Sequence, residues 1–299
     1  MICSVCIATY KRSELLRKLL DSILLQNLPD NIKLQVIIVD NDMEKSAEHI
    51  VSEYENRDNI KFEYFVQPEK NISLTRNVAV DNSKGEYLLF IDDDEEADKN
   101  WIIKYLEAIN KYNADGVFGP VFPLFHEQTP GWMKECNFFT KECPPTGDTA
   151  VFTRTSNCII KAELIKSEPG PFDPTYGITG GEDSHLFTRL RRKGANFISS
   201  KEAIVTEFIP PERTTMKWLI IKSFQTGNTA TRRMIENANN KLLRKVELFF
   251  RAIVFEIISF ILIIVHLPSK KLSAKWLMKF ASNAGHIIAV IGFNYKGYK

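Results

Sequence analysis

Residues 87–98 read Tyr-Leu-Leu-Phe-Ile-Asp-Asp-Asp-Glu-Glu-Ala-Asp, an apolar run that leads directly into three consecutive aspartates. A buried strand that ends in this way places several carboxylates at the carboxyl edge of a sheet, where open α/β sheets bind their ligands. Carboxylates such as Asp92 and Asp94 are hard oxygen ligands, suited to Mg²⁺ or Mn²⁺ that is shared with substrate phosphates. A solvated acidic turn would also explain the triplet taken alone, so the surrounding sequence decides between the two.

The segment before and after this strand alternates apolar runs with helical patterns. Strands are expected at 2–8, 36–39, 62–66 and 87–91, with helices between them. The first two runs are continuously apolar, as expected for strands that are covered on both faces. This βαβαβ rhythm predicts an α/β fold with a mostly parallel sheet, right-handed crossovers and flanking helices.

The charge is distributed unevenly along the 299 residues. The net charge is +2, but the segment from Arg213 to the C-terminus contains 15 Lys or Arg and 3 Asp or Glu. An acidic body with a basic tail suggests a membrane surface or a polyanionic partner. Nucleic acid is disfavoured as that partner, because the tail is also strongly apolar.

Two apolar stretches, 248–267 and 276–293, lie in this basic tail and are interrupted by charged or polar residues. The uninterrupted part of the first is about ten residues, short of the roughly 20 that span a bilayer. We therefore expect helices that lie in a membrane interface. A packed helical hairpin of a soluble protein is the alternative.

The five cysteines are scattered, and Cys3 and Cys6 lie on one predicted strand, where residues three apart point to opposite faces. Structural roles and a reducing compartment are therefore expected. The first residues already form a core strand, so no signal peptide is expected.

The stretch from about 116 to 181 is punctuated by prolines and rich in aromatic residues. Long loops of this kind in compact domains tend to be lids or binding loops. Trp132, Phe138 and Phe139 are candidates for stacking on a bound ligand, and filling the core beneath a loop is the alternative interpretation.

Four separate segments are expected to meet at one sheet edge. They are Thr9-Tyr10-Lys11-Arg12, Asp40 to Asp42, the segment from Asn71 to Asn77 that contains Arg76, and Asp92-Asp93-Asp94. Together they offer an acceptor for a base imide, a cation for phosphate and carboxylates for a metal. The sequence contains no Gly-x-Gly-x-x-Gly and no Walker-type Gly-Lys-Ser/Thr, which excludes the usual dinucleotide and P-loop sites.

A fifth feature is Gly180-Gly181-Glu182-Asp183, directly before a helical pattern. The spacing of Asp183 from Leu186, Phe187 and Leu190 predicts that it shares their inward stripe. A first-turn acid favoured by the helix dipole is the alternative, and it explains Glu182 better than Asp183. A carboxylate in a polar pocket at this position can take the proton from an attacking hydroxyl.

Taken in order, these motifs resemble family 2 glycosyltransferases with the GT-A fold. The matching pieces are Cys-Ile-Ala-Thr-Tyr-Lys-Arg, Ile-Ile-Val-Asp-Asn, Leu-Thr-Arg-Asn, Phe-Ile-Asp-Asp-Asp, Thr-Ser-Asn-Cys and Gly-Gly-Glu-Asp. The resemblance covers about residues 2–210. Pro-Pro-Glu-Arg, Trp218 and Gln-Thr-Gly227 further resemble bacterial exopolysaccharide transferases of the succinoglycan type. The implied organisation is a nucleotide-sugar-binding half (1–115), an acceptor-binding half with the catalytic base (116–212) and a basic, apolar helical region (213–299).

The resemblance implies an inverting hexosyltransferase of class EC 2.4 with a nucleoside-diphosphate donor, usually UDP-linked, and Mg²⁺ or Mn²⁺. In this interpretation Thr9, Asp40 and Arg76 hold the nucleoside, Asp92 the ribose, Asp94 the metal, and Asp183 is the base. The full set of expected site residues adds Tyr10, Arg12, Asp42 and Asp93 on the donor side, and Trp132, Asn157 and Glu182 on the acceptor side.

The sequence departs from the family pattern at two positions. Asn41 stands where the family often has a second Asp, which leaves open whether Asp40 or Asp42 reads the base. Glu207 stands near the place where many members have a metal-binding His, so a protein ligand beyond Asp94 is an open question.

The expected acceptor is a saccharide, or a lipid-linked saccharide, of a growing surface polysaccharide. The expected location is the cytoplasmic face of a bacterial cell membrane, peripheral or weakly anchored through the C-terminal helices. Two alternatives remain at this point: a metal-dependent nucleotidyltransferase and a non-catalytic nucleotide-sugar-binding module. The first normally has a glycine-rich loop after strand one, where this chain has Thr-Tyr-Lys-Arg. The second is disfavoured by the presence of both Asp94 and Asp183.

Overall fold

The computed structural model describes residues 1–56, 59–236, 238–293 and 295. The chain divides into two compact units, which are treated separately below. The first unit consists of Met1–Leu124, Phe139–Gly177 and Glu182–Phe208. The second consists of Phe125–Phe138, Ile178–Gly181 and Ile209–Lys299.

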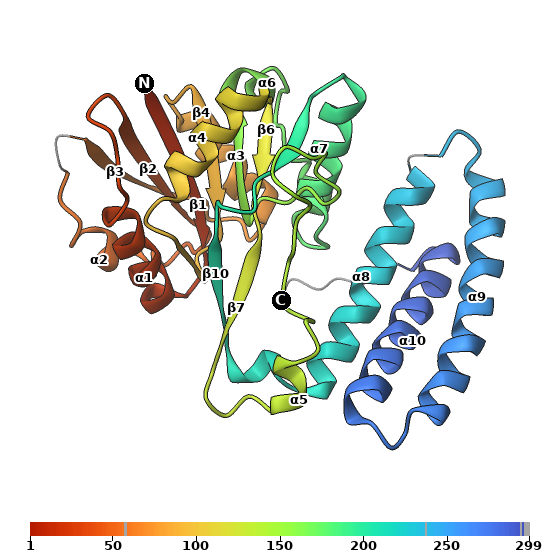
Figure 1. Ribbon diagram of the computed structural model, residues 1–299. Helices are drawn as coiled ribbons and strands as arrows, with labels where there is room; N and C mark the ends of the chain where they lie inside the picture. The colour runs from red at the N-terminus through yellow and green to blue at the C-terminus, as the bar shows by residue number, and fades with distance from the viewer. Residues whose placement is uncertain (57–58, 237, 294, 296–299) are drawn as a thin grey trace. The chain divides into compact units, whose positions relative to one another are not determined.

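Within the described residues, the main sheet of the first unit has seven strands in the order β3-β2-β1-β4-β8-β6-β9. Figure 1 labels β3, β2, β1, β4 and β6 of this sheet. Strands β3, β2, β1 and β4 are parallel, whereas β8 runs antiparallel to both β4 and β6. The α/β class with a mostly parallel sheet is therefore confirmed. The bounds are β1 Ile2–Thr9, β2 Lys33–Asp40, β3 Ile60–Val66, β4 Tyr87–Ile91, β6 Gly116–Phe118, β8 Asn157–Lys161 and β9 Phe197–Ser199.

Helices cover both faces of this sheet, because its central strands are apolar on both sides. In β2, Val36 and Ile38 belong to one hydrophobic core, and Ile37 and Val39 belong to the other. The helices that pack into the first core are α1 Ser13–Leu24, α2 Glu48–Val51 and α4 Trp101–Tyr112. Those that pack into the second are α3 Ile72–Asn82, α6 Ala162–Lys166 and α7 Glu182–Arg192.

A smaller sheet extends the carboxyl edge of the first. Its order is β5-β10-β7, with bounds β5 Glu95–Ala97, β10 Val205–Ile209 and β7 Val121–Phe125. β10 runs antiparallel to β5, and Glu207 stands directly opposite Glu95. Because β5 begins at the residue after Asp94, this sheet fixes the chain that leaves the acidic triplet.

The second unit is dominated by three long helices, α8 Met216–Glu236, α9 Lys241–Val265 and α10 Lys270–Val290. Helices α8 and α10 approach closely at two glycines: a Cβ on Gly227 would lie 2.0 Å from the carbonyl oxygen of Ser282, and one on Gly285 would lie 2.1 Å from that of Phe224. The unit also contains the short helix α5 Gly131–Lys134 and the 3₁₀ turn η2 Pro211–Arg213. A further 3₁₀ turn, η1 Pro174–Tyr176, belongs to the first unit. Residues 294 and 296–299 of the predicted C-terminal region lie outside the described residues.

Helix α9 is strongly apolar, with a mean hydropathy of 2.6 over its most apolar 18 residues, of which 17% are buried. Within the described part of the chain, it is the one helix whose length and composition would allow it to cross a membrane. Its exposed large apolar residues are Leu242, Leu243, Val246, Phe250, Val254, Phe255, Ile257, Ile258, Phe260, Ile261, Ile264 and Val265.

Candidate active site

The segments expected at one sheet edge do meet there. The last residue of β1, Thr9, pairs in register with the last residue of β2, Asp40. The Thr9 hydroxyl donates to Asp93 Oδ2 at 2.9 Å, and Arg12 Nη1 donates to Asp93 Oδ1 at 2.8 Å and to Asp94 Oδ2 at 3.0 Å. The parallel order of β1, β2 and β4 produces this meeting, because their carboxyl ends share one edge.

The Asp92–Asp94 turn is held by backbone and side-chain contacts. Glu95 Oε2 accepts from the Asp92 N–H at 2.9 Å, and the Glu95 N–H donates to the Asp92 carbonyl at 3.1 Å. The Phe208 N–H in β10 donates to the Asp94 carbonyl at 2.8 Å. Asp93 and Asp94 are buried, whereas the Asp92 side chain is 38% exposed. Burial raises the pKa of Asp93, although Arg12 and the Thr9 hydroxyl oppose this change.

The end of β2 distinguishes the roles of Asp40, Asn41 and Asp42. Asp40 accepts from the Asp42 N–H, the Ala47 N–H and the Tyr64 hydroxyl, at 3.0, 2.8 and 2.9 Å. Asp42 is 6% exposed, and its Oδ2 has no hydrogen-bond partner; Lys11 Nζ lies 3.7 Å from this oxygen. Asp40 therefore folds the turn, while Asp42 has a buried oxygen that is free to accept a hydrogen bond.

The side chain of Asn41 is hydrogen-bonded to the loop that follows β3. Its Nδ2 donates to the carbonyls of Gln67 and Glu69 at 2.8 and 2.6 Å, and its Oδ1 accepts from the Asn71 N–H at 2.9 Å. Asn71 in turn caps α3, accepting from the N–H groups of Ser73 and Leu74. The amide thus ties β2 to the start of the helix that carries Arg76.

Arg76 lies in α3 and is 9% exposed. Its guanidinium forms an ion pair with Glu182, and its Nη2 donates to Asp92 Oδ1 at 3.2 Å. Burial alone would lower the pKa of Arg76, but the charges of Glu182, Asp92 and Asp183 outweigh it and raise the pKa. Arg76 therefore connects the acidic turn to the first turn of α7.

The first turn of α7 differs from the sequence prediction. Glu182 is the buried carboxylate, on the stripe of Leu186 and Leu190, whereas Asp183 is half-buried. The sequence placed Asp183 on the inward stripe, but the buried carboxylate there is Glu182, because Arg76 matches its charge and allows it to be buried. Asp183 lies close enough to this pair for its charge to act on Arg76, and its Oδ1 accepts from the Ser184 N–H at 2.5 Å.

Asn157, expected at the acceptor, is fully buried at the start of β8. Its Oδ1 accepts from Trp101 Nε1 and from the Tyr105 hydroxyl, and its Nδ2 donates to the carbonyls of Pro120 and Ala203, both at 2.8 Å. No polar atom of its side chain remains for a sugar. Asn157 therefore holds the fold together and is left out of the acceptor site proposed below.

The aromatic candidates lie in different settings. Tyr10 is half-buried at the sheet edge, and Lys70 Nζ lies 4.2 Å from its ring centroid. Trp132 belongs to α5 in the second unit, where its ring meets that of Phe138 edge-on at 6.5 Å. Phe139 is buried, in agreement with the core-filling alternative.

Two basic residues of the region were missed from the sequence. Lys141 Nζ lies 2.7 Å from Glu207 Oε2 and 3.6 Å from Glu95 Oε1. Arg154 is the other: burial lowers its pKa, while the charges of Asp183 and Glu95 act to raise it. Both residues come from the proline-rich stretch, where no periodic pattern indicates which side chains face the sheet.

The carboxylates of the Asp92–Asp94 turn are of the ligand type that divalent cations prefer. The protein alone does not supply a full set of ligands for such an ion. In the described part of the chain, no group of three His, Cys, Asp or Glu side chains is arranged to hold a metal. Mg²⁺ is usually bound by one or two carboxylates together with substrate phosphates. Asp94 with a diphosphate ligand would match that pattern.

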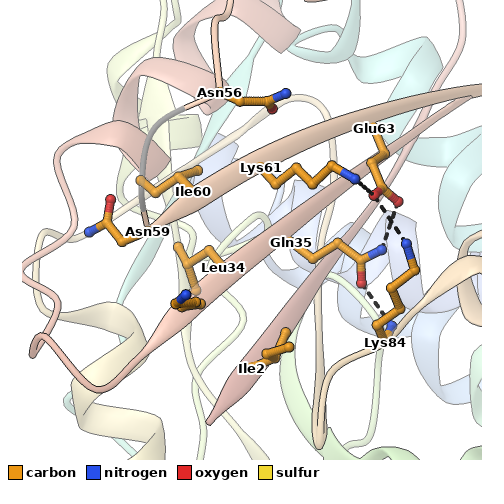
Figure 2. Close-up of a pocket in the computed structure, with 10 residues that line it drawn as sticks. Ile2, Leu34, Gln35, Asn56, Asn59, Ile60, Lys61, Glu63 and Lys84 are labelled. Atoms are coloured by element: carbon orange, nitrogen blue, oxygen red, sulfur yellow. Dashed lines mark hydrogen bonds and ion pairs between the residues drawn. The ribbon is translucent and has the colours of Figure 1, made fainter.

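The first unit also contains a cavity of about 380 Å³, whose lining residues are drawn in Figure 2. It is lined by Ile2, Lys33, Leu34, Gln35, Asn56, Asn59, Ile60, Lys61, Glu63 and Lys84. Ile2, Lys33 and Ile60 are the first residues of β1, β2 and β3, so the cavity lies at the amino edge of the sheet. Lys61 and Lys84 both pair with Glu63 there. This cavity is therefore separate from the candidate active site.

Comparisons with known proteins agree with this geometry. The family described as "Glycosyl transferase family 2" matches residues 4–166. The chain is 32% identical over 234 residues to the succinoglycan biosynthesis protein ExoM of Rhizobium meliloti (strain 1021), a match that covers 78% of this chain and 75% of that protein. It is 28% identical over 205 residues to the poly(ribitol-phosphate) beta-N-acetylglucosaminyltransferase TarS of Staphylococcus aureus (strain Mu50), covering 66% of this chain and 33% of TarS.

Solved structures show the same fold. The crystal structure of S. aureus TarS 1-349 superimposes with a TM-score of 0.54 at 18% identity, covering 82% of this chain and 68% of that one. The same fragment in complex with UDP gives a TM-score of 0.51, covering 82% and 69%. The fold is thus of the GT-A type, and the relatives include enzymes of polymer biosynthesis. The family match over more than half of the sequence, together with the identity to ExoM, shows that this chain belongs to glycosyltransferase family 2.

Proposed function

We propose that this chain transfers a sugar from a nucleoside-diphosphate donor, a UDP-sugar, to a saccharide acceptor with inversion at the anomeric carbon. The proposal is carried by one observation. The Asp92–Asp94 turn, the buried Arg76 and the buried Asp42 Oδ2, which has no hydrogen-bond partner, meet at one sheet edge. Such a donor has a base with an imide N–H, a ribose with two hydroxyls, and a diphosphate. The complex of TarS with UDP, a protein of the same fold, supports a uridine nucleotide.

Asp42 is the residue we assign to the base. Its Oδ2 is buried without a hydrogen-bond partner, and leaving such an atom unsatisfied costs about 1–3 kcal/mol. The imide N–H of uracil would satisfy it. Asp40 and Asn41 already use their side-chain oxygens within the protein, so neither is available for this contact. Thr9, Tyr10 and Arg76 would complete the nucleoside site, with Asp92 at the ribose.

Asp94 would hold a divalent cation, Mg²⁺ or Mn²⁺, because such ions are commonly bound by one or two carboxylates together with substrate phosphates. When bound, the cation supplies Lewis-acid stabilisation of the departing diphosphate. Arg12, which pairs with Asp93 and Asp94, adds positive charge at the same place and orients both carboxylates.

Asp183 is proposed as the general base. Its carboxylate accepts the proton from an acceptor hydroxyl, and the oxygen forms a bond to the anomeric carbon. The bond from that carbon to the diphosphate breaks, and the nucleoside diphosphate leaves with the electron pair. Because attack comes from the face opposite the leaving group, the configuration is inverted. Glu182 is held by Arg76, so Asp183 is the acid of this turn that remains free to reach the acceptor.

The acceptor is proposed to be a growing surface polysaccharide, lipid-linked, at the cytoplasmic face of a bacterial membrane. The relationship to a succinoglycan biosynthesis protein supports the polysaccharide, and the exposed apolar side of α9 supports peripheral attachment. Trp132 is proposed to contact the acceptor sugar. Flotation of the protein with anionic vesicles, lost in the variant Val254→Glu/Ile258→Glu, is the expected result. Equal flotation of both proteins would argue against attachment through α9.

Calorimetric titration of UDP, GDP and dTDP, each with and without Mn²⁺, tests the donor site. UDP is expected to bind only with the metal, and Asp94→Ala is expected to abolish this binding. Asp81→Ala, at an exposed position of α3, is the matched control and should bind as the wild type does. If no nucleotide binds in a metal-dependent way, the transfer mechanism described above is wrong.

A further inference from the structure

We propose that Lys141 is a positioning residue for the donor site: its ammonium group neutralises two facing glutamates, Glu95 and Glu207, and thereby holds the Asp92–Asp94 turn in its binding geometry. The inference rests on the proposed function, which assigns that turn to the donor. It concerns a residue outside the motifs by which the sequence identifies the site.

Glu95 and Glu207 form an unfavourable pair across the small sheet. They stand directly opposite each other in the antiparallel ladder of β5 and β10, where like charges are destabilising. Both are buried, and Glu95 Oε1 has no hydrogen-bond partner. Burial and the charges of Asp92 and Glu207 raise the pKa of Glu95, and the ammonium of Lys141 opposes this rise. A cation close to both carboxylates therefore favours the ionised pair.

Lys141 provides that cation. Its Nζ lies 2.7 Å from Glu207 Oε2 and 3.6 Å from Glu95 Oε1, the oxygen that has no hydrogen bond. Burial alone would lower the pKa of Lys141, but the charges of Glu95 and Glu207 outweigh it and raise the pKa, which keeps the ammonium charged. Its backbone is anchored too, since Lys141 and Val121 exchange N–H···O bonds of 2.9 and 3.0 Å.

The contact is transmitted to the acidic turn through Glu95. While Oε1 of this carboxylate faces Lys141, Oε2 accepts the Asp92 N–H at 2.9 Å. The backbone of Glu95 closes the same turn through the Asp92 carbonyl. Without the ammonium, repulsion from Glu207 would push the Glu95 carboxylate away from the Asp92 N–H. The Asp92–Asp94 turn would then lose the hydrogen bond from the Asp92 N–H to Glu95, which orients the aspartate side chains.

The test compares three variants for UDP binding in the presence of Mn²⁺ and for donor kinetics. Lys141→Met removes the charge at similar length and is expected to weaken UDP binding about tenfold or more, because it leaves buried carboxylates uncompensated. The donor KM should rise by a similar factor while kcat changes little, since Asp183 is untouched. Lys141→Arg keeps the charge and should bind UDP within about threefold of the wild type.

The double variant Lys141→Met/Glu207→Gln separates charge from packing. It removes one of the two facing charges, so it should regain most of the lost affinity if repulsion is the cause. A thermal melt of each variant reports whether the chain is folded. If Lys141→Met fails to fold, the double variant should fold again because one of the two facing charges is gone, and failure of both to fold would argue against the electrostatic claim.

Lys161→Met is the matched control. Lys161 on β8 forms a half-buried ion pair with Asp115 at 2.9 Å, at a distance from the acidic turn. Its loss should lower the melting temperature and leave UDP binding unchanged. Lys141→Met binding UDP like the wild type, or a double variant as weak as the single one, would overturn the inference. Failure of the wild type to bind UDP with Mn²⁺ would instead refute the proposed function.

Discussion

Replacing Arg76 by methionine is expected to destabilise the first unit strongly. Arg76 and Glu182 are each less than a tenth exposed, and removing one partner of a buried ion pair costs about 3–5 kcal/mol. The pair with Asp92 adds less than about 1 kcal/mol, because that side chain is 38% exposed. Since domains are stable by about 5–15 kcal/mol, the substitution removes a large part of the total free energy of unfolding.

A double-mutant cycle identifies the cause of this loss. Glu182→Gln alone keeps an acceptor for Arg76 and should cost about 1–3 kcal/mol. Arg76→Met/Glu182→Leu removes both charges, so it should be clearly more stable than Arg76→Met. Arg17→Met, which breaks the more exposed pair with Glu53, is the control and should lower the free energy of unfolding far less than Arg76→Met does.

Urea unfolding followed by tryptophan fluorescence is a suitable assay. Of the four tryptophans, Trp101 alone belongs to the first unit, so the other three are replaced by phenylalanine in every protein of the series. The signal then reports the unit that contains the ion pair and avoids mixing two unfolding transitions. A loss below 1 kcal/mol in Arg76→Met, or a double variant no more stable than it, would refute the reasoning.

Three other predictions concern catalysis, donor recognition and pH. Asp183→Asn should lower kcat about 10²–10⁴-fold with UDP affinity unchanged, measured by transfer kinetics and calorimetry; near-normal turnover would reject this base. Asp42→Leu should weaken UDP binding about tenfold, whereas the exposed Met43→Leu beside it should not; equal affinities would remove Asp42 from the base site. Burial opposes ionisation of Asp115, but the Asn196 N–H and Lys161 outweigh it and lower its pKa below 3.8. Its contribution to stability is therefore present above about pH 4 and is lost as pH falls through the folded-state pKa. The stability difference between the wild type and Asp115→Asn should shrink in that range, and a constant difference would contradict the assignment.

The sheet and the edge that carries the donor site were predictable from the sequence. Continuous apolar runs indicated β1 and β2 as strands covered on both faces, and the polar residues after each run indicated where they end. Parallel order then required Thr9, Asp40 and Asp92 to come together, since neighbouring parallel strands end at one edge. The antiparallel insertion of β8 was not predictable, because its four buried residues carry no sign of strand direction.

The contacts within the site depend on partners that are distant in sequence. Whether Glu182 or Asp183 is buried is decided by Arg76, which lies 106 residues before Glu182. Asn157 carries a motif typical of the family, yet its four bonds to Trp101, Tyr105, Pro120 and Ala203 are visible only in the folded chain. Lys141 belongs to a stretch with no periodicity, so no sequence pattern connects it with Glu95.

The hydrogen bond from the Phe208 N–H to the Asp94 carbonyl has a consequence for the order of events during synthesis. The acidic turn is translated early, but the strand that closes it comes more than a hundred residues later. At 5–20 residues per second this is a delay of roughly 5–20 s on the ribosome. During that time the nascent chain contains the donor carboxylates without β10 beside them. The amino-terminal half alone therefore cannot complete the site, and nucleotide binding by a growing chain should begin only after β10 has emerged.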